Sequence, residues 1–203
     1  MSESANKFFA HESCYIDDGA EIGEGTRIWH FSHVMSGARV GAGCNIGQNV
    51  VIHSTAVVGN GVKIQNNVSV YDGVVLEDNV FCGPSMVFTN VINPRSHMPR
   101  KDEYMKTLVR QGATIGANAT VLCGNTIGKH AFIGAASLVS RDVPDFGLVF
   151  GIPAKLQGWM CKCGVRLDLP LCSEGKTSTC CETCGRSYEQ EGGKVALIAE
   201  PSE

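Results

Sequence analysis

Apolar residues recur every six positions along most of this chain. In steps of six from Ile16, each position as far as Phe88 is apolar, and the register resumes at Val109 and continues to Val139. These nineteen positions, called stations below, are all apolar, whereas a composition that is 43% hydrophobic would give about eight apolar residues among them. Sixteen of them are Ile or Val, which favour strands. A period of six fits neither a helix nor an alternating strand, so the pattern predicts a short strand and a corner in each hexapeptide.

Two other positions of the hexapeptide also have a restricted composition. The residue four places after the station is small or apolar in most repeats, and we expect it to point inward with the station. The residue directly after the station is often glycine, which we expect to relax the backbone at the corner. These glycines are Gly23, Gly41, Gly47, Gly59, Gly83, Gly116, Gly128 and Gly134.

From Ile16 to Lys155 this pattern resembles the hexapeptide repeat of the left-handed β-helix acyltransferases. In that family three hexapeptides form one triangular coil, with a rise of roughly 4.8 Å. The resemblance implies an all-β fold, a left-handed parallel β-helix with an extruded loop and a small cysteine-rich C-terminal tail. We divide the chain into an acyltransferase domain, residues 1–155 with its loop at 89–108, and a tail, residues 156–203. The resemblance also implies a homotrimer with active sites between subunits.

Three features favour acyl transfer from coenzyme A. The repeat is interrupted at 89–108, and a long excursion from a compact repeat is more often functional than a tolerated insertion. Gly151-Ile-Pro-Ala-Lys155 resembles the segment that closes the β-helix in this family, where the lysine can approach the phosphates of coenzyme A. A terminating turn with an exposed lysine would have the same sequence. Small residues leave room for the pantetheine arm, although the fold also demands them: Gly116, Ala117, Gly134 and Ala135.

Three segments sharpen the resemblance: RIWHFSHV (27–34), KIQNNVSVYDGV (63–74) and FCGPSMVFTNVINPRS (81–96). They look like the N-acetyltransferases that act on the 3-amino group of UDP-linked 2-acetamido-3-amino-2,3-dideoxyglucuronic acid in lipopolysaccharide O-antigen biosynthesis. Related enzymes use dTDP-linked amino sugars. Such a substrate needs cationic and amide donors. The candidates are Arg27, His30, His33, Lys63, Gln65, Asn67, Tyr71 and Arg95, each of which could instead be an exposed ladder, corner or loop residue.

Transfer to an amine needs orientation more than a strong base, because an amine with a pKa of about 8 is partly neutral at neutral pH. Asn90, where the repeat gives way to the loop, is our candidate for the essential polar residue. Its rivals as a base are His97, in the same loop, and His130, at a predicted corner.

The tail has a different chemistry. Cys161-Lys-Cys163-Gly and Cys181-Glu-Thr-Cys184-Gly resemble the two knuckles of a zinc ribbon, so we predict a structural zinc site. The first pair lacks the commoner C-x-x-C spacing, and Cys172 and Cys180 are alternative ligands. A tail with free thiols and no metal is also compatible with the sequence.

The remaining composition limits the partners and the compartment. A net charge of -3 provides no basic surface for nucleic acid, and no apolar run approaches the ~18 residues of a membrane span. The first residues lack the apolar stretch of a signal peptide, and ten cysteines then favour the cytoplasm.

Three further functions are compatible with a β-helix of this kind. A γ-class carbonic anhydrase would need an H-x-x-x-x-H pair, and no two histidines here are five apart. An acetyltransferase for a dTDP-linked amino sugar or for a sugar hydroxyl would use the same scaffold. A non-enzymatic β-helix interaction subunit would not bind coenzyme A.

Overall fold

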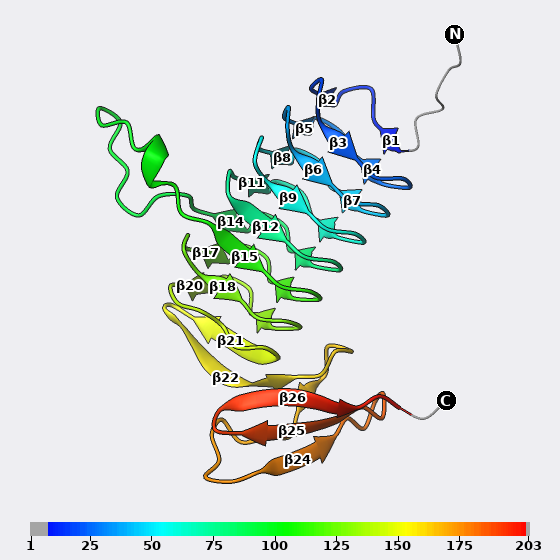
Figure 1. Cartoon of the computed structure of the whole chain (residues 1–203), viewed down its shortest axis with the longest axis vertical. Helices are drawn as coiled ribbons and strands as arrows, with labels where there is room; N and C mark the ends of the chain where they lie inside the picture. The colour runs from blue at the N-terminus through cyan, green and yellow to red at the C-terminus, as the bar shows by residue number, and fades with distance from the viewer. Residues whose placement is uncertain (1–7, 202–203) are drawn as a thin grey trace.

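The computed structural model describes residues 8–201, which form a β-solenoid followed by a small antiparallel sheet (Figure 1). The expected all-β, left-handed parallel β-helix with an extruded loop is confirmed. Each coil has three faces, named here A, B and C in chain order. Face A begins with parallel strands of two residues each: β1 (Phe9–Ala10), β4 (Arg27–Ile28), β7 (Asn45–Ile46), β10 (Lys63–Ile64), β13 (Phe81–Cys82), β16 (Thr114–Ile115) and β19 (Phe132–Ile133).

Faces B and C are built in the same way. Face B consists of two short sheets, with strands β2 (Tyr15–Ile16), β5 (His33–Val34), β8 (Val51–Ile52) and β11 (Ser69–Val70), then β14 (Val87–Phe88), β17 (Thr120–Val121) and β20 (Leu138–Val139). Face C contains β3 (Glu21–Ile22), β6 (Arg39–Val40), β9 (Val57–Val58), β12 (Val74–Leu76), β15 (Thr107–Val109) and β18 (Thr126–Ile127).

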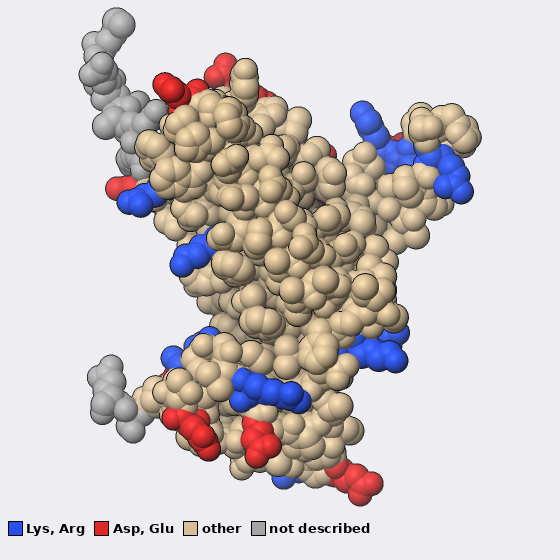
Figure 2. Space-filling model, turned by 180° about the vertical axis from the view of Figure 1, so that it is seen from behind, with Lys and Arg blue, Asp and Glu red and all other residues tan. Residues whose placement is uncertain are grey.

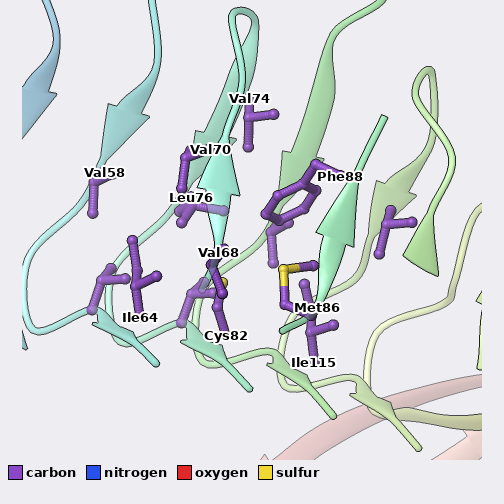
Figure 3. Packing of buried hydrophobic residues seen from close by; sticks show 14 of the residues in the cluster. Val58, Ile64, Val68, Val70, Val74, Leu76, Cys82, Met86, Phe88 and Ile115 are labelled. Atoms are coloured by element: carbon purple, nitrogen blue, oxygen red, sulfur yellow. The ribbon is translucent and has the colours of Figure 1, made fainter. Parts of the chain in front are cut away.

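The stations of the six-residue pattern are the inward residues of these strands. From Ile28 to Val139 every station is at most 4% exposed, and together they form one continuous core. Figure 3 shows this packing around Phe88 and Met86, where the side chains of successive coils lie against one another. The side chains four places after the stations, such as Ala38 and Ala113, fill the rest of the interior. The prediction that the station and the residue four places after it both point inward is therefore correct.

The role expected for the glycines after the stations is wrong. The left-handed backbone lies two residues further on, as at Gly43, Asn49 and Asn67, with φ of 66, 57 and 61°. The glycines that follow the stations are needed for close packing between coils. A Cβ on Gly47 would lie 2.7 Å from Asn66 Oδ1 and 2.8 Å from the Asn66 backbone nitrogen, because the next coil rests directly on it.

The loop leaves the solenoid without disturbing the stacking. Arg27 pairs with Asn45 and Asn45 with Lys63, each 18 residues on, but Val75 pairs with Leu108, 33 residues on. The additional residues form a projection that includes one short 3-10 helix, η1 (Lys101–Glu103) (Figure 1). The repeat therefore resumes in register after the excursion.

The solenoid ends where the chain reverses. β21 (Gly147–Gly151) pairs in parallel with β19, and β22 (Ala154–Met160) then pairs antiparallel with β21, followed by β23 (Arg166–Leu167). β22 runs through position 155, so the boundary placed there divides a single strand. The tail sheet comprises β24 (Thr177–Cys180), β25 (Ser187–Glu191) and β26 (Lys194–Ala199). Among residues 8–201, no helix has the length and apolar character needed to cross a membrane.

The contact at Gly47 yields a stability prediction. Gly47→Ala should lower the free energy of unfolding by about 1–3 kcal/mol, because the methyl group would push two coils apart. Gly175→Ala is the matched control, because no heavy atom lies within 4 Å of a Cβ at that position. Chemical denaturation of both variants measures the difference. Equal midpoints for the two would contradict close stacking at Gly47.

Candidate functional site

Many of the predicted site residues lie at or beside two corners of the triangular coil. Corner AB, the turn from face A to face B, comprises residues 29–31, 47–49, 65–67, 83–85, 116–118 and 134–136. Corner BC, the turn from face B to face C, includes residues 53–55, 71–73 and 122–124, and the loop leaves from it after β14. The width of face B separates the two corners along the whole solenoid.

Most of the predicted substrate-binding residues lie at or beside corner AB. Arg27 and Lys63 are exposed on face A, two strands apart, with Asn45 between them. His30 stacks on His11 with ring centroids 3.6 Å apart. Asn67 accepts a hydrogen bond from Asn49 Nδ2 at 3.0 Å and has a left-handed φ, so it forms part of an asparagine ladder as well as a corner.

The residues proposed to line the pantetheine arm also lie at corner AB. Gly116, Ala117, Gly134 and Ala135 stack directly on one another, and a Cβ on Gly116 would lie 2.6 Å from the Ala135 nitrogen. They therefore serve the stacking of the coils whether or not they contact a ligand. Gln65, in the same corner column, is half-buried.

His33 is placed differently from the other predicted residues. It lies on face B in β5, where its Nε2 is 2.9 Å from Asp17 Oδ1. The hydrogen bond from His33 lowers the pKa of Asp17. Asp17 lies at corner BC of the first coil, so this pair is four coils before the level of Asn90.

Asn90 is held at the base of the loop by contacts on both sides. The hydroxyl of the preceding Thr89 accepts a hydrogen bond from the Cys123 N–H at 2.9 Å, one coil on. The Asn90 carbonyl accepts one from the Met105 N–H at 2.9 Å, where the loop returns. The Asn90 side chain is half-buried, and no side-chain hydrogen bond joins it to another residue in the range 8–201. A fixed backbone with an available amide is suited to binding a ligand.

Corner BC also carries a pair that the sequence analysis missed. His53 Nδ1 lies 3.4 Å from Asp72 Oδ2, and the ring of Tyr71 lies 5.0 Å from that of His53. Burial raises the pKa of Asp72, but hydrogen bonds from the Thr55 N–H and hydroxyl, with His53, outweigh it and lower the pKa. Asp72 therefore stays ionised beside the imidazole. The sequence contained one signal for this pair. Asp72 precedes Asn90 by 18 residues, which is the length of one coil, so the two residues lie at the same corner in successive coils.

The loop carries the remaining candidates and much of the positive charge on its side of the molecule (Figure 2). Arg95 and His97 are both exposed, and Arg95 donates to the Pro94 carbonyl. Nη1 of Arg100 donates to both carboxylate oxygens of Glu103, at 2.7 and 2.9 Å, and this ion pair spans η1. Because His97 is exposed, burial does not fix its ring.

A hollow lies below corner BC at the end of the solenoid. Its walls are largely apolar, from Val139 to Leu156, and Arg141, Asp142 and Lys155 also line it. The Asp142 carboxylate accepts a hydrogen bond from the Thr126 N–H at 2.7 Å. Two cations beside an apolar surface can bind a phosphate-bearing ligand with an organic arm. Arg141 was not among the predicted residues, although it lies at corner BC two coils after Asn90.

His130 lies at the third corner, the turn from face C to face A, whereas Asn90 lies at corner BC. Its ring stacks on Phe146 with centroids 5.4 Å apart. Burial lowers the pKa of His130, and the nearby cations Lys162, Lys129 and Arg186 lower it further, while Asp145 opposes them. The imidazole is therefore neutral at neutral pH.

The four tail cysteines predicted to bind metal come together. The Sγ atoms of Cys161, Cys163, Cys181 and Cys184 all lie within 4.8 Å of one another. Cys172 and Cys180, also considered as ligands, are exposed and lie outside this group.

Parts of this chain are similar in sequence to a known protein family and to named acetyltransferases. The model described as bacterial transferase hexapeptide (six repeats) matches residues 11–54. The chain is 38% identical over 97 residues to the dTDP-3-amino-3,6-dideoxy-alpha-D-galactopyranose 3-N-acetyltransferase of Aneurinibacillus thermoaerophilus, covering 48% of this chain and 47% of that protein. It is 37% identical over 78 residues to a 2,3,4,5-tetrahydropyridine-2,6-dicarboxylate N-acetyltransferase of Staphylococcus aureus, covering 38% and 30%. These matches span about half, or less, of the relatives' length.

Solved structures are similar in part. The acetyltransferase domain of PglB from Neisseria gonorrhoeae, in complex with acetyl coenzyme A, matches 74% of this chain and 58% of that chain at 21% identity, with a TM-score of 0.49. PerB from Caulobacter crescentus, in complex with CoA and GDP-perosamine, matches 75% and 58% at 21% identity, with a TM-score of 0.32.

The burial of His130 yields a pH prediction. Its folded-state pKa should lie below the usual value near 6.5, so protons bind the unfolded chain first. Stability should therefore fall as pH drops from about 6.5 toward the folded-state pKa, and this contribution should level off below it. NMR titration of the ring C–H gives the pKa, and His130→Gln should remove this part of the pH dependence. His97→Gln, at an exposed position, is the control. A His130 pKa at or above 6.5 would overturn the prediction.

Proposed function

We propose that this chain is a transferase of the bacterial hexapeptide-repeat family and that it moves the acetyl group of acetyl-CoA onto the amino group of a nucleotide-linked sugar. The observation that carries this proposal is the 38% identity over 97 residues to an enzyme named as a 3-N-acetyltransferase of a dTDP-linked 3-amino sugar. The relative is matched over only 47% of its length, so the activity is inferred from shared residues and from the site.

The specific substrate proposed is UDP-linked 2-acetamido-3-amino-2,3-dideoxyglucuronic acid, in cytoplasmic O-antigen sugar biosynthesis. Its carboxylate and diphosphate require cations, and Arg27 and Lys63 are exposed on one face with Asn45 between them. Arg95 adds a third cation on the loop. A dTDP-linked amino sugar is the second candidate, favoured by the name of the Aneurinibacillus relative.

Coenzyme A would lie along corner BC. The cations Arg141 and Lys155 suit its phosphates, and the apolar wall beside them suits the pantetheine arm. Asn90 is two coils nearer the N-terminus at the same corner, which is roughly 10 Å at about 4.8 Å per coil. With this order, the thioester end of the cofactor would lie toward Asn90.

The chemistry at Asn90 is acyl transfer to nitrogen. The neutral sugar amine attacks the thioester carbonyl, a tetrahedral oxyanion forms, the C–S bond breaks, and the proton lost by nitrogen balances the proton gained by the coenzyme A thiolate. The Asn90 amide can donate to the oxyanion or accept from the amine, and either contact stabilises the transition state. The His53–Asp72 pair is at the same corner, one to two coils before Asn90, and is a candidate general base.

A homotrimer is part of the proposal, because the candidate residues lie at two corners of one chain. Arg27 and Lys63 lie beside corner AB and Asn90 lies at corner BC. When corner AB of one subunit faces corner BC of the next, one cleft contains both groups. The outward side chains of face B support such packing, since none of them is Lys, Arg, Asp or Glu: Tyr15, His33, Val51, Ser69, Val87, Thr120 and Leu138. Figure 2 shows a broad uncharged area on the solenoid.

The proposed function predicts thiol release with amino sugars. Purified protein with acetyl-CoA should be offered UDP- and dTDP-linked 3-amino sugars and their 3-hydroxy counterparts while free thiol is followed. We expect release with the UDP-linked amino uronate and little with the hydroxy sugars, and a trimer mass by light scattering of the same sample. Release only with hydroxy sugars, or none with any acceptor and no coenzyme A binding by calorimetry, would exclude the proposal.

Asn90 should be the side chain that catalysis needs most. Asn90→Ala should reduce kcat/KM by roughly 10²-fold or more, about 2.7 kcal/mol, because a donor that acts in the transition state is lost. His97→Ala and His130→Ala should stay within about tenfold of wild type. The rate should rise with pH through the pKa of the acceptor amine. A near-normal Asn90→Ala with an inactive His53→Gln would instead indicate a general base held by Asp72.

A further inference from the structure

We propose that Cys161, Cys163, Cys181 and Cys184 bind one zinc ion as thiolates, and that this ion joins the two parts of the tail against the last coil of the solenoid. The inference is independent of the transferase activity. It rests on the positions of the four sulfur atoms, on the turns that present them and on the groups packed around them.

The sulfur atoms are spaced for a tetrahedral ion. Four sulfurs at about 2.3 Å from zinc lie about 3.8 Å from one another along the edges of the tetrahedron. Here Cys161 and Cys184 are 3.3 Å apart, Cys163 and Cys181 are 3.7 Å apart, and no pair exceeds 4.8 Å. Small displacements would bring all four to one ion. Four thiolates in a tetrahedron favour zinc over the harder cations, which prefer oxygen.

Both cysteine pairs lie in turns of the same kind. The N–H of Gly164 donates to the Cys161 carbonyl at 2.9 Å, and the N–H of Gly185 donates to the Cys181 carbonyl at 2.8 Å. In each turn the N–H of the first cysteine donates to the carbonyl of the residue after the glycine, at 2.8 Å. The glycines have φ of 87 and 72°, a left-handed conformation that glycine adopts without strain. The C-x-C pair therefore makes a knuckle despite its shorter spacing.

The surroundings are suited to thiolates. Tyr188 is fully buried, and its hydroxyl lies 3.1 Å from Cys161 Sγ while accepting the Lys162 N–H at 3.0 Å. With that acceptor position occupied, the hydroxyl donates its hydrogen to the sulfur. A hydrogen bond of this kind orients a metal ligand and stabilises its charge.

Two cations lie next to the ligands. Zinc with four thiolates carries a net charge of -2, and Lys162 and Arg186 are each adjacent in sequence to ligand-bearing knuckles. Both bind the Glu200 carboxylate, at 2.7 and 2.6 Å, so the end of β26 also bridges the two knuckles. The knuckles are thus held side by side by protein contacts, and the ion would complete the connection.

The site is attached to the solenoid through aromatic packing. Tyr188 contacts Phe146 edge to face at 5.4 Å, and Phe146 stacks on His130 of the last coils. Cys161 and Cys163 follow β22, which pairs with the solenoid, whereas Cys181 and Cys184 precede β25 of the tail sheet. One ion therefore links a strand of the solenoid to the separate sheet.

The experiment measures zinc directly in the full-length protein. Protein purified without chelator should contain about one zinc per chain by elemental analysis. Titration with an organomercurial should release it as the thiols react, with a metallochromic dye as the readout. Cobalt in place of zinc should give the visible and thiolate charge-transfer bands of a tetrahedral thiolate site.

Variants separate the ligands from the other cysteines. Cys163→Ser and Cys184→Ser should lower the metal content at least fivefold, whereas Cys172→Ser and Cys180→Ser should leave it at one per chain. Hydrogen exchange on the wild-type chain after zinc removal should show faster exchange in β24 to β26, with solenoid strands unchanged, even if a ligand variant fails to fold. Metal-free protein with slow exchange in the tail, or disulfides joining Cys161 to Cys184 and Cys163 to Cys181, would overturn the proposal. Loss of acetyl transfer alone would not bear on it.

Discussion

Backbone hydrogen bonding between coils is the constraint on which the rest of the structure depends. Each strand from β1 to β20 has only two or three residues, so none is stable alone. Each is held by the strands of the neighbouring coils, which are 18 residues away except across the loop. The bonds are short and regular, as in Lys63 N–H to the Val80 carbonyl at 2.9 Å. A chain that must repeat this contact at every coil must also repeat its side-chain sizes. The six-residue pattern in the sequence results from that requirement.

This requirement explains which parts of the fold the sequence could predict. The stations face the core at every coil, so burial selects the same residue type at each of them, and their period is visible without a structure. The corners are less visible, because their left-handed residues vary: Gly43 and Asn49 are expected there, but Phe31, Ser85 and His130 also adopt φ between 54 and 58°. The glycines after the stations were visible but misinterpreted, since a sequence does not show how closely the next coil approaches.

The candidate site was predictable only in part. Asn90 stood out because it is where the pattern stops, and the four cysteines stood out because of their spacing and following glycines. His53 and Asp72 were missed because each looks like an ordinary surface residue within its own hexapeptide. Their meeting depends on the stacking of adjacent coils, which becomes apparent only when the chain is folded in units of 18. Arg141 was missed for a similar reason, since it joins Lys155 only after the chain reverses at β21.

The reversal of the chain after β21 has a consequence for assembly along the solenoid axis. A stack of parallel strands exposes unpaired N–H and C=O groups on its last strand, and another molecule could add to them as a further coil. Here β22 occupies that edge of β21 in the antiparallel sense, and β23 then pairs with β22, so the ladder of face A turns away from the repeat. An incoming coil with the 18-residue register would meet strands running in the wrong direction. The tail therefore limits the length of the solenoid to a single chain, and a molecule cut before β22 would present a surface for end-to-end fibre growth.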